Sequence, residues 1–320
     1  MRLLLPLLLV LSACRPLDGA VDKVEDARAR NDGPAIWLVT DESTQGDSRL
    51  YLYGTLHIIP AGLDWQRDDM WDAFSSAGTV WFETPSDEST SARIDALTRS
   101  RGFLPLGERI TDRLDDYETR LLEVAALSAD IPFEVLDTMR PWLASELLTL
   151  AAAEQAGLSA RISPDEALKS RARRTAKFTA YLDSPLEQFA LSADADPEVQ
   201  LRTLRSTLER YNRIAGELRT IAEEWVEGDV ETLDTRLAES ITGAPRQTLM
   251  TDRNARWADT LGQWMDGFGT GFAAVGVGHL VGEDSLPDML AERGYTVRRY
   301  YAFQGENLIR TESLEVDTGG

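Results

Sequence analysis

The sequence predicts an α/β (α+β) fold, in which a central mixed β-sheet has a large helical insertion between its third strand and its C-terminal strands. Short segments rich in β-branched and aromatic residues occupy residues 35–85 of the 320-residue chain. Apolar residues at helical spacing dominate residues 88–261, and strand-like segments return at residues 269–303. We therefore expect a single folded domain over residues 34–303.

The N-terminus precedes this domain and has the pattern of an export signal. Residues 1–13 contain one basic residue, Arg2, and an apolar run that is too short to span a bilayer, as in a signal peptide. The ending "LSAC", whose last residue is Cys14, resembles the bacterial lipobox, which implies cleavage before Cys14 and lipidation of its thiol. An ordinary signal peptide that is cut nearby is the alternative. Cys14 is the only cysteine, so no intramolecular disulfide can form.

The residues that flank the domain are expected to be a tether and a tail. Residues 14–33 are polar and contain no aromatic residue, which predicts a tether between a lipid on Cys14 and the domain. Residues 304–320 are expected to form a frayed tail. We expect an anchored chain of this kind at the periplasmic face of an envelope membrane. Arg15, rather than an aspartate, follows the cysteine and favours the outer membrane.

The domain is expected to begin with the order β-β-α-β. Two strands are predicted at residues 35–41 and 48–59, with a polar hairpin connection between them. Residues 68–78 carry apolar residues at helical spacing and end at a glycine, so they are predicted to form a helix. A short apolar strand is predicted at residues 79–85, where Pro85 ends it.

The middle of the chain, from about residue 88 to residue 261, is predicted to be helical. Residues 141–158 carry apolar residues three and four positions apart. A longer stripe from Leu201 to Trp225 has a spacing close to 3.5 and predicts a helix packed on other helices. We interpret the basic cluster at residues 171–177 as a solvated helix face.

The chain is expected to return to the sheet after the helical region. A buried strand is predicted at the centre of residues 269–282. A short helix at residues 285–294 and a final strand at residues 295–303 are expected to follow it.

The charge balance limits the possible partners. The chain has 33 basic and 54 acidic residues, which gives a formal net charge of -21. A nucleic-acid partner requires a basic surface that neutralises phosphates. We therefore expect no nucleic-acid partner.

Histidine occurs only twice in the chain, each time in the same local setting. His57 ends the strand-like run of "RLYLYGTLHIIP", and His279 ends that of "GFAAVGVGHLVG". In both segments a glycine stands three residues before the histidine, and glycine lets the backbone turn sharply and lets another group approach closely. Active-site residues in mixed α/β folds gather where buried strands end. We therefore expect both histidines to point into one cleft.

Glu83 closes the third predicted strand, in "TVWFETP", and joins the two histidines as a candidate. A buried carboxylate needs a partner. Two imidazoles and one carboxylate form a common ligand set for a divalent metal ion, whose bound water is a usable nucleophile. Two alternatives remain open. Each histidine could be a hydrogen-bonded structural residue, and Glu83 could form a salt bridge with a nearby arginine.

At these motifs the chain resembles the TraB/PrgY/GumN family, which includes the Tiki metalloproteases. The matching segments are "GTLH" (residues 54–57), "FETP" (82–85), "GVGH" (276–279) and "LMTDRNARWADTL" (249–261). The resemblance implies a central sheet wrapped by helices and a metal-dependent, peptidase-like activity on a peptide or protein substrate. It favours Mn²⁺ or Co²⁺ as the cofactor, with Zn²⁺ as a further candidate.

Three residues carry the expected metal centre. His57, Glu83 and His279 match the family motifs and are expected to hold the ion. In an alternative arrangement Glu83 is the general base, and Glu283 or Asp284, just after the second histidine, supplies a further acidic ligand.

The "RN" segment suggests two further roles. Arg253 is expected to stabilise the oxyanion of a tetrahedral intermediate, and Asn254 to orient the substrate or a ligand. The alternative for both is a helix cap or a surface salt bridge. Thr55, inside the first motif, is a candidate to bond a ligand oxygen, or it is only a good strand residue.

The sequence thus predicts a lipid-anchored, metal-dependent hydrolase that acts as a peptidase. The alternative is a non-catalytic lipoprotein of the same fold that binds a peptide or haem. A third hypothesis makes both histidines purely structural, so that His57→Ala and His279→Ala each reduce stability and change nothing else.

Overall fold

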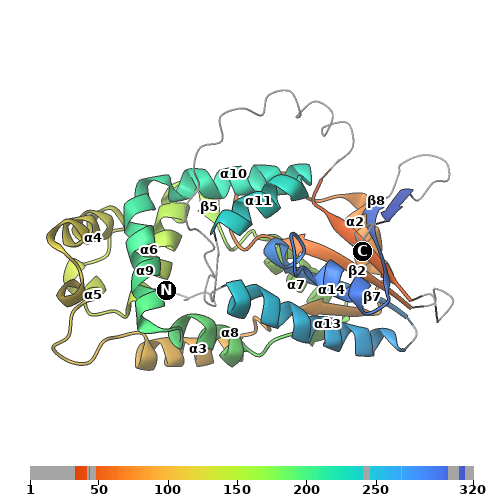
Figure 1. The fold of residues 1–320 in the computed structure, drawn as a ribbon, viewed down its shortest axis with the longest axis horizontal. Coiled ribbons are helices and arrows are strands. Elements are labelled where there is room, and N and C mark those ends of the chain that lie inside the picture. The colour runs from red at the N-terminus through yellow and green to blue at the C-terminus, as the bar shows by residue number, and fades with distance from the viewer. Residues whose placement is uncertain are drawn as a thin grey trace, which may run out of the picture.

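The structure is a computed structural model, and it describes residues 33–41, 43, 48–240, 246–267, 269–301 and 310–313. The predicted signal peptide, Cys14 and all but the last residue of the predicted tether lie outside the described residues. The described chain contains a twisted sheet with helices packed on it, and further helices extend from one end (Figure 1). No helix in this part of the chain is both long enough and apolar enough to cross a membrane.

The main sheet has seven strands. They are β1 (Ile36–Thr40), β2 (Ser48–Thr55), β4 (Thr79–Phe82), β6 (Phe178–Tyr181), β7 (Gly269–Gly276), β8 (Thr296–Tyr301) and β9 (Arg310–Ser313). Their order is β6-β4-β7-β2-β1-β8-β9. The neighbours β6, β4, β7 and β2 are parallel, whereas β1, β8 and β9 pair antiparallel. The carboxyl ends of the four parallel strands therefore meet at one edge of the sheet.

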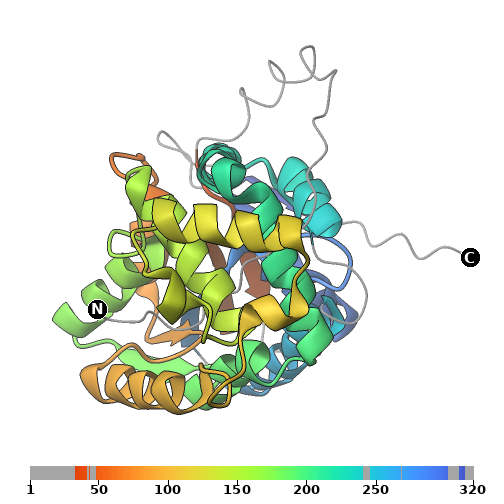
Figure 2. The ribbon, with the colours of Figure 1, turned by 90° about the vertical axis from the view of Figure 1, so that its left-hand side faces the viewer.

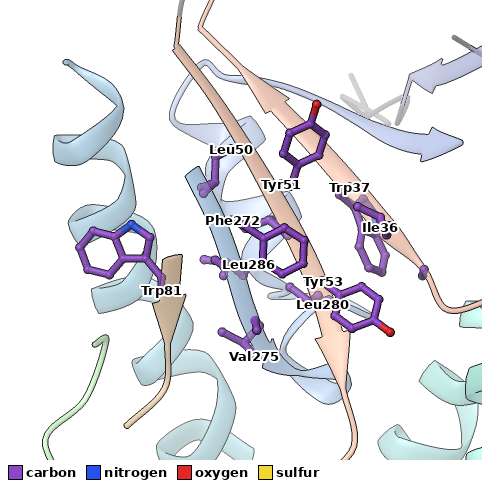
Figure 3. Packing of buried hydrophobic residues seen from close by; sticks show 14 of the residues in the cluster. Ile36, Trp37, Leu50, Tyr51, Tyr53, Trp81, Phe272, Val275, Leu280 and Leu286 are labelled. Carbon is purple, nitrogen blue, oxygen red and sulfur yellow. The ribbon is translucent and has the colours of Figure 1, made fainter. Parts of the chain in front are cut away.

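Helices cover both faces of this sheet. Successive side chains of a strand point to opposite faces, and on β7 the ring of Phe272 lies 5.4 Å from that of Phe74 in α2 (Asp68–Ser76). The preceding residue, Gly271, faces α13 (Asp252–Met265), because a Cβ there would approach Trp264 to 2.6 Å. Apolar side chains of β1, β2 and β7 fill the space beside the strands (Figure 3). Two further helices, α7 (Pro164–Arg174) and α14 (Leu286–Glu292), also pack on the strands.

The other helices lie between β4 and β7 in the chain, and most of them share a second core. They are α3 (Glu88–Arg101), α4 (Asp116–Ser128), α5 (Phe133–Leu136), α6 (Pro141–Gln155), α8 (Pro185–Ala193), α9 (Pro197–Arg210), α10 (Ile214–Glu227) and α11 (Val230–Ser240). The second core includes the buried residues Leu122, Leu148 and Leu204 and is separate from the core of the sheet. Figure 2 shows these helices in front of the strands.

The structure confirms the predicted fold class and corrects four details. The region predicted to be helical also contains β6 and β5 (Leu158–Ser159), which pairs with β3 (Ile59–Pro60). The stripe from Leu201 to Trp225 is not one helix, because a 3₁₀ turn separates α9 from α10. The second predicted strand ends at Thr55, so His57 lies beyond it. The predicted tail is not wholly frayed, because β9 pairs with β8.

The missed strand β6 has a simple physical explanation. It is four residues long, "FTAY", and such a short run gives no clear period between two helices. Its place in the sheet is fixed by pairing with β4, which lies almost a hundred residues earlier in the sequence. Long-range pairing of this kind overrides the local pattern.

Candidate active site

His57, Glu83 and His279 meet at the carboxyl edge of the parallel strands. The strand register places them at the same height along the sheet, because Thr55 at the end of β2 pairs with Gly276 at the end of β7. His57 lies two residues beyond β2, and Glu83 lies one residue beyond β4. His279 ends the 3₁₀ turn that follows β7. The structure thus brings the three predicted residues together from three strand ends.

Gly276 marks the point where these three side chains converge. A Cβ built on Gly276 would lie 3.2 Å from Oε1 of Glu83 and 3.7 Å from Cδ2 of His279. The same Cβ would lie 4.0 Å from Nε2 of His57. The three residues therefore surround one small space beside the glycine, which any larger residue would fill.

The glycine of the first motif has a different role. A Cβ on Gly54 would lie 2.9 Å from Cγ2 of Val277, in the turn that carries His279. The backbone oxygen of Gly54 also accepts a hydrogen bond from Nε1 of Trp225 at 2.8 Å. Gly54 therefore allows close packing of β2, whereas Gly276 keeps the candidate site open.

His57 is held by a buried carboxylate that the sequence analysis missed. Its Nδ1 lies 2.7 Å from Oδ2 of Asp165, which also accepts a hydrogen bond from Oγ1 of Thr55 at 3.0 Å. Asp165 is buried in the first turn of α7, whereas the side chain of His57 is 39% exposed. Partial burial lowers the pKa of His57, but the charge and the hydrogen bond of Asp165 outweigh it, so the pKa is raised above its ordinary value. Thr55 therefore helps to hold the carboxylate of Asp165 in the position that contacts His57.

Glu83 is buried and bound on both of its oxygens. Oε1 accepts the backbone N–H of Gly276 at 2.7 Å, and Oε2 accepts a hydrogen bond from Nη2 of Arg253 at 2.7 Å. Burial raises the pKa of this carboxyl. Arg253, and after it the two histidines, lower the pKa by more than burial raises it, so the pKa lies well below its usual range. The salt bridge to an arginine, which the sequence left open as the alternative for Glu83, is present.

His279 is buried, and its contacts indicate a neutral ring. Nε2 lies 3.0 Å from Nη1 of Arg253, and a guanidinium can only donate, so Nε2 is the acceptor. Nδ1 then carries the proton and donates to Oδ1 of Asn254 at 2.7 Å. Asn254 in turn donates to the backbone oxygen of Asp284 at 2.8 Å. Burial, and after it the charge of Arg253, lowers the pKa of His279 to about 3.

Arg253 connects the site to a second buried acid. Its Nε donates to Oδ2 of Asp183 at 2.9 Å, and its Cζ lies 4.5 Å from the centre of the Trp257 ring. Trp257 is buried and donates from Nε1 to Oδ1 of Asp183 at 3.0 Å. The charge of Arg253, which is only 1% exposed, is thus balanced by Glu83 and Asp183. Neither a helix cap nor a surface salt bridge describes this residue.

The predicted ligands suit a divalent metal ion in chemical kind. Imidazole nitrogens and a carboxylate oxygen are suitable ligands for Mn²⁺, Co²⁺ or Zn²⁺, and the space beside Gly276 lies between them. Within the described residues, however, no group of three or more His, Cys, Asp or Glu side chains is arranged to hold an ion. Arg253 bonds both Nε2 of His279 and Oε2 of Glu83. It must release these atoms before the three residues can share an ion.

Glu283 and Asp284, the candidates for a further acidic ligand, are exposed. The backbone oxygen of Glu283 accepts a hydrogen bond from Arg246 at 2.9 Å, and Oδ2 of Asp284 lies 3.4 Å from Oγ1 of Thr251. Among the contacts of the described residues, the acids that reach the site are Asp165 and Asp183 instead.

Both of these acids look ordinary in the sequence. Asp165 follows Ser163 and Pro164 at the start of a helix, where acidic residues are common because they favour the helix dipole. Asp183 precedes a second helix start of the same kind. Recognition of β6 would have identified Asp183, because a strand that ends at Tyr181 places Asp183 beside Glu83 at the carboxyl edge of the sheet.

Comparison with known proteins covers all of these residues. A sequence model of the TraB/PrgY/gumN family matches residues 35–299, which confirms the resemblance that the motifs indicate. The uncharacterized protein YbaP of Escherichia coli (strain K12) is 24% identical over 254 residues, which cover 79% of this chain and 92% of YbaP. YbaP of Shigella flexneri matches with the same identity and coverage. No solved structure gives a significant match.

Proposed function

The chain belongs to the TraB/PrgY/gumN family, and we propose that it is a metal-dependent hydrolase, namely a peptidase, whose centre lies between His57, Glu83 and His279. The observation that carries the proposal is the space beside Gly276, where groups from three strand ends lie within 4.0 Å of one Cβ position. A divalent ion bound there, Mn²⁺ or Co²⁺ before Zn²⁺, would supply a water of lowered pKa and polarise a scissile carbonyl.

Hydrogen bonds with neighbouring residues fix the orientation of the two histidine rings. Asp165 bonds Nδ1 of His57, and Asn254 bonds Nδ1 of His279. Both rings are thereby held through Nδ1, which is how second-shell groups orient metal-binding histidines. Nε2 of His57 lies beside the shared space, whereas Nε2 of His279 becomes available only when Arg253 releases it.

Arg253 has two roles in this proposal. It balances the buried acids before an ion binds, and it gives up its contacts with His279 and Glu83 when one does. Its Nε contact with Asp183 and its stacking on Trp257 keep the guanidinium near the site while its Nη1 and Nη2 groups move away from His279 and Glu83. The released N–H groups can then donate to the substrate oxygen that becomes negative as the carbonyl is attacked.

Glu83 is a proposed ligand, and in the alternative arrangement it is the general base. It is a weak base while Arg253 holds it, because its pKa lies well below the usual range. Release of that contact raises its pKa. The carboxylate then takes a proton from the attacking water and passes it to the leaving amine. The water oxygen forms a bond to the carbonyl carbon, and the C–N bond breaks.

We also propose that Cys14 carries a lipid and holds the chain at the periplasmic face of an envelope membrane. The "LSAC" sequence supports this, and Arg15 favours the outer membrane. Mass spectrometry of the purified protein should show a diacylglyceryl group on an N-terminal Cys14. Cleavage at another position, or an unmodified thiol, would contradict the anchor.

A non-catalytic lipoprotein that binds a peptide or haem is the second candidate function. One observation favours it, namely that Arg253 already bonds His279 and Glu83, so the buried groups are paired without an ion. This candidate predicts capture of a ligand without turnover.

Metal titration of the purified chain tests the proposal. Mn²⁺, Co²⁺ and Zn²⁺ are titrated into the wild type, His57→Ala, His279→Ala and the control Glu283→Gln, which changes an exposed acid near the second histidine. We expect one tight site in the wild type and the control, and no such site in either histidine variant. Cleavage of a peptide library, read by mass spectrometry, should follow the same pattern. A wild type that binds none of the three ions would overturn the proposal.

A further inference from the structure

The edge of the sheet at β6 leads directly to the candidate site. β6 is the first strand in the sheet order, and within the described residues β4 is its pairing partner. The pairing continues beyond the strand, because the N–H of Leu182 donates to the oxygen of Phe82 at 3.0 Å. The N–H of Asp183 donates to the oxygen of Glu83 at 2.8 Å. Because Asp183 also holds Arg253, the edge strand and the site are two residues apart.

The backbone groups that point away from the sheet belong to Thr179 and Tyr181. In a parallel pair, alternate residues direct their N–H and C=O to the same neighbour, and Leu182 points to β4. Ala180 shares that direction, so the two residues beside it point outward. In the part of the chain that the structure describes, these outward groups form no hydrogen bond. They are available to another extended chain.

The residues of β6 do not block this edge. Natural sheets protect open edges with charged residues, proline or bulges, and "FTAY" has neither charge nor proline. The side chains of Phe178 and Tyr181 are 69% and 43% exposed, and Leu186 in the first turn of α8 is 41% exposed. An edge lined by apolar side chains is suited to adding an extended segment as a further strand.

The end of β6 beside α7 has a charge opposite in sign to the formal net charge of the whole chain, which is -21. Arg173 and Arg174 are exposed at the end of α7, and a tight turn joins them to β6. At the other end Arg256 is exposed and lies 3.4 Å from Asp183. The nearby Glu187 is engaged in capping α8. The open edge is therefore basic at the end beside α7, whereas at the other end Arg256 is paired with Asp183 and interacts with Glu187.

We propose that β6 binds an extended segment of the polypeptide substrate by strand addition. Apolar side chains of the segment lie against Phe178 on one face of the sheet and against Tyr181 on the other, and an acidic residue at the end beside α7 faces Arg173 and Arg174. The inference rests on the proposed function and defines its substrate class as polypeptides rather than very short peptides. Neighbouring strands lie about 4.8 Å apart, so the added strand is about 10 Å from β4. The site beside Gly276 in β7 lies one strand further, about 14 Å from the added strand, and four or five extended residues cover that distance.

Thr179→Pro is the sharpest test, because proline removes an outward N–H and leaves the β4-facing groups of Ala180 and Leu182 intact. Thr179→Ala is the matched control. Both changes are made in the full chain carrying His57→Ala, so that bound peptide is not cleaved. The probe is a pool of fluorescein-labelled dodecapeptides with apolar residues and threonines in varied order, so that both faces carry apolar side chains, and a glutamate at each end. We expect the alanine variant to bind like its parent and the proline variant to bind at least about tenfold more weakly.

Two further measurements keep the test independent of how well the proline variant folds. The double variant Arg173→Glu, Arg174→Glu should prefer a matched pool with lysines at the ends. In the parent, hydrogen exchange at the amides of Thr179 and Tyr181 should slow when the glutamate pool binds. Unchanged exchange, or equal binding by the proline and alanine variants, would overturn the inference.

The outcomes also separate this inference from the proposed function. Peptide capture that Thr179→Pro removes upholds strand addition even if no cleavage is ever found. Cleavage by the wild type that Thr179→Pro leaves unchanged upholds the hydrolase and overturns strand addition. If the free chain sediments as a dimer that Thr179→Pro dissociates, a second copy occupies the edge and the inference is wrong.

Discussion

The turns that carry His57 and His279 share one sequence pattern and differ in their chemical environment. His57 is partly exposed and faces the negative charge of Asp165, so its pKa is raised. His279 is buried and faces the positive charge of Arg253, so its pKa is lowered to about 3. The motif therefore determines where each histidine lies, and residues from other elements determine its protonation. Each of the following predictions removes or measures one part of this difference.

Removal of Arg253 should have the largest effect. Arg253→Met leaves Glu83 and Asp183 buried without their counter-charge, and we expect the free energy of unfolding to fall by about 3–5 kcal/mol. Urea unfolding at pH 7 measures it. Arg256→Met is the control, because this exposed partner of Asp183 should contribute less than about 1 kcal/mol. A similar small loss in both variants would show that the buried network does not stabilise the fold.

The two glycines should respond differently to alanine. Gly54→Ala forces a Cβ against Val277, and we expect it to destabilise the protein by about 1–3 kcal/mol. In Gly276→Ala the new methyl lies beside Oε1 of Glu83, so we expect a similar or smaller loss of stability but a marked loss of metal binding and turnover. Thermal unfolding and metal titration of both variants check this. Retention of full metal binding in Gly276→Ala would rule out the space beside it as the centre.

The pH dependence of stability should have opposite signs for the two histidines. The folded-state pKa of His279, about 3, lies below the ordinary value of about 6.5. Its contribution is therefore complete above pH 6.5 or so and is lost as the pH falls toward 3. The raised pKa of His57 gives a contribution that is complete below about pH 6.5 and is lost as the pH rises through the folded-state pKa.

Difference curves isolate the two contributions. The free energy of unfolding is measured from pH 4 to pH 8 for the wild type, His57→Gln and His279→Gln. The wild type minus His279→Gln should rise with pH below about 6.5, and the wild type minus His57→Gln should fall above it. Each slope should be at most about 1.4 kcal/mol per pH unit. Slopes of the same sign would contradict the assigned environments.

Replacement of Asp165 should have the smallest effect on stability and a specific effect on one ring. Asp165→Asn keeps an oxygen for Nδ1 of His57 but removes the charge, so we expect the pKa of His57 to fall. The loss of stability at pH 6 should be below about 1 kcal/mol, because the side chain of His57 is 39% exposed and solvent screens the pair. NMR titration of the two histidine Cε1 protons measures both rings, and His279 serves as the internal control. An unchanged titration of His57 would contradict the role of Asp165.

The sequence was sufficient to predict β1, β2, β4, β7 and β8 of the main sheet and the convergence of the three central residues, but not β6 or β9. Strand composition is a local property, and a residue just beyond a parallel strand end lies at a known edge of the sheet. The partners that set protonation could not be predicted in the same way. Asp165 and Asp183 begin helices far away in the sequence, and only the pairing of β6 and the packing of α7 bring them to the site. The "RN" segment identified Arg253, but the acids that balance its charge, Glu83 and Asp183, are distant in the sequence and meet it only in the folded chain.

The chain enters the domain at the same edge of the sheet as the site. β1 is antiparallel to β2, and Ile36 at its start pairs with Tyr53 near the carboxyl end of β2. The 18 residues between Cys14 and Gly33 therefore join the domain close to the edge that carries the histidines, and so few residues reach at most about 65 Å. With a lipid on Cys14, the site would stay within a thin layer above the membrane. Geometric access to that layer would then select substrates before any side chain recognises them.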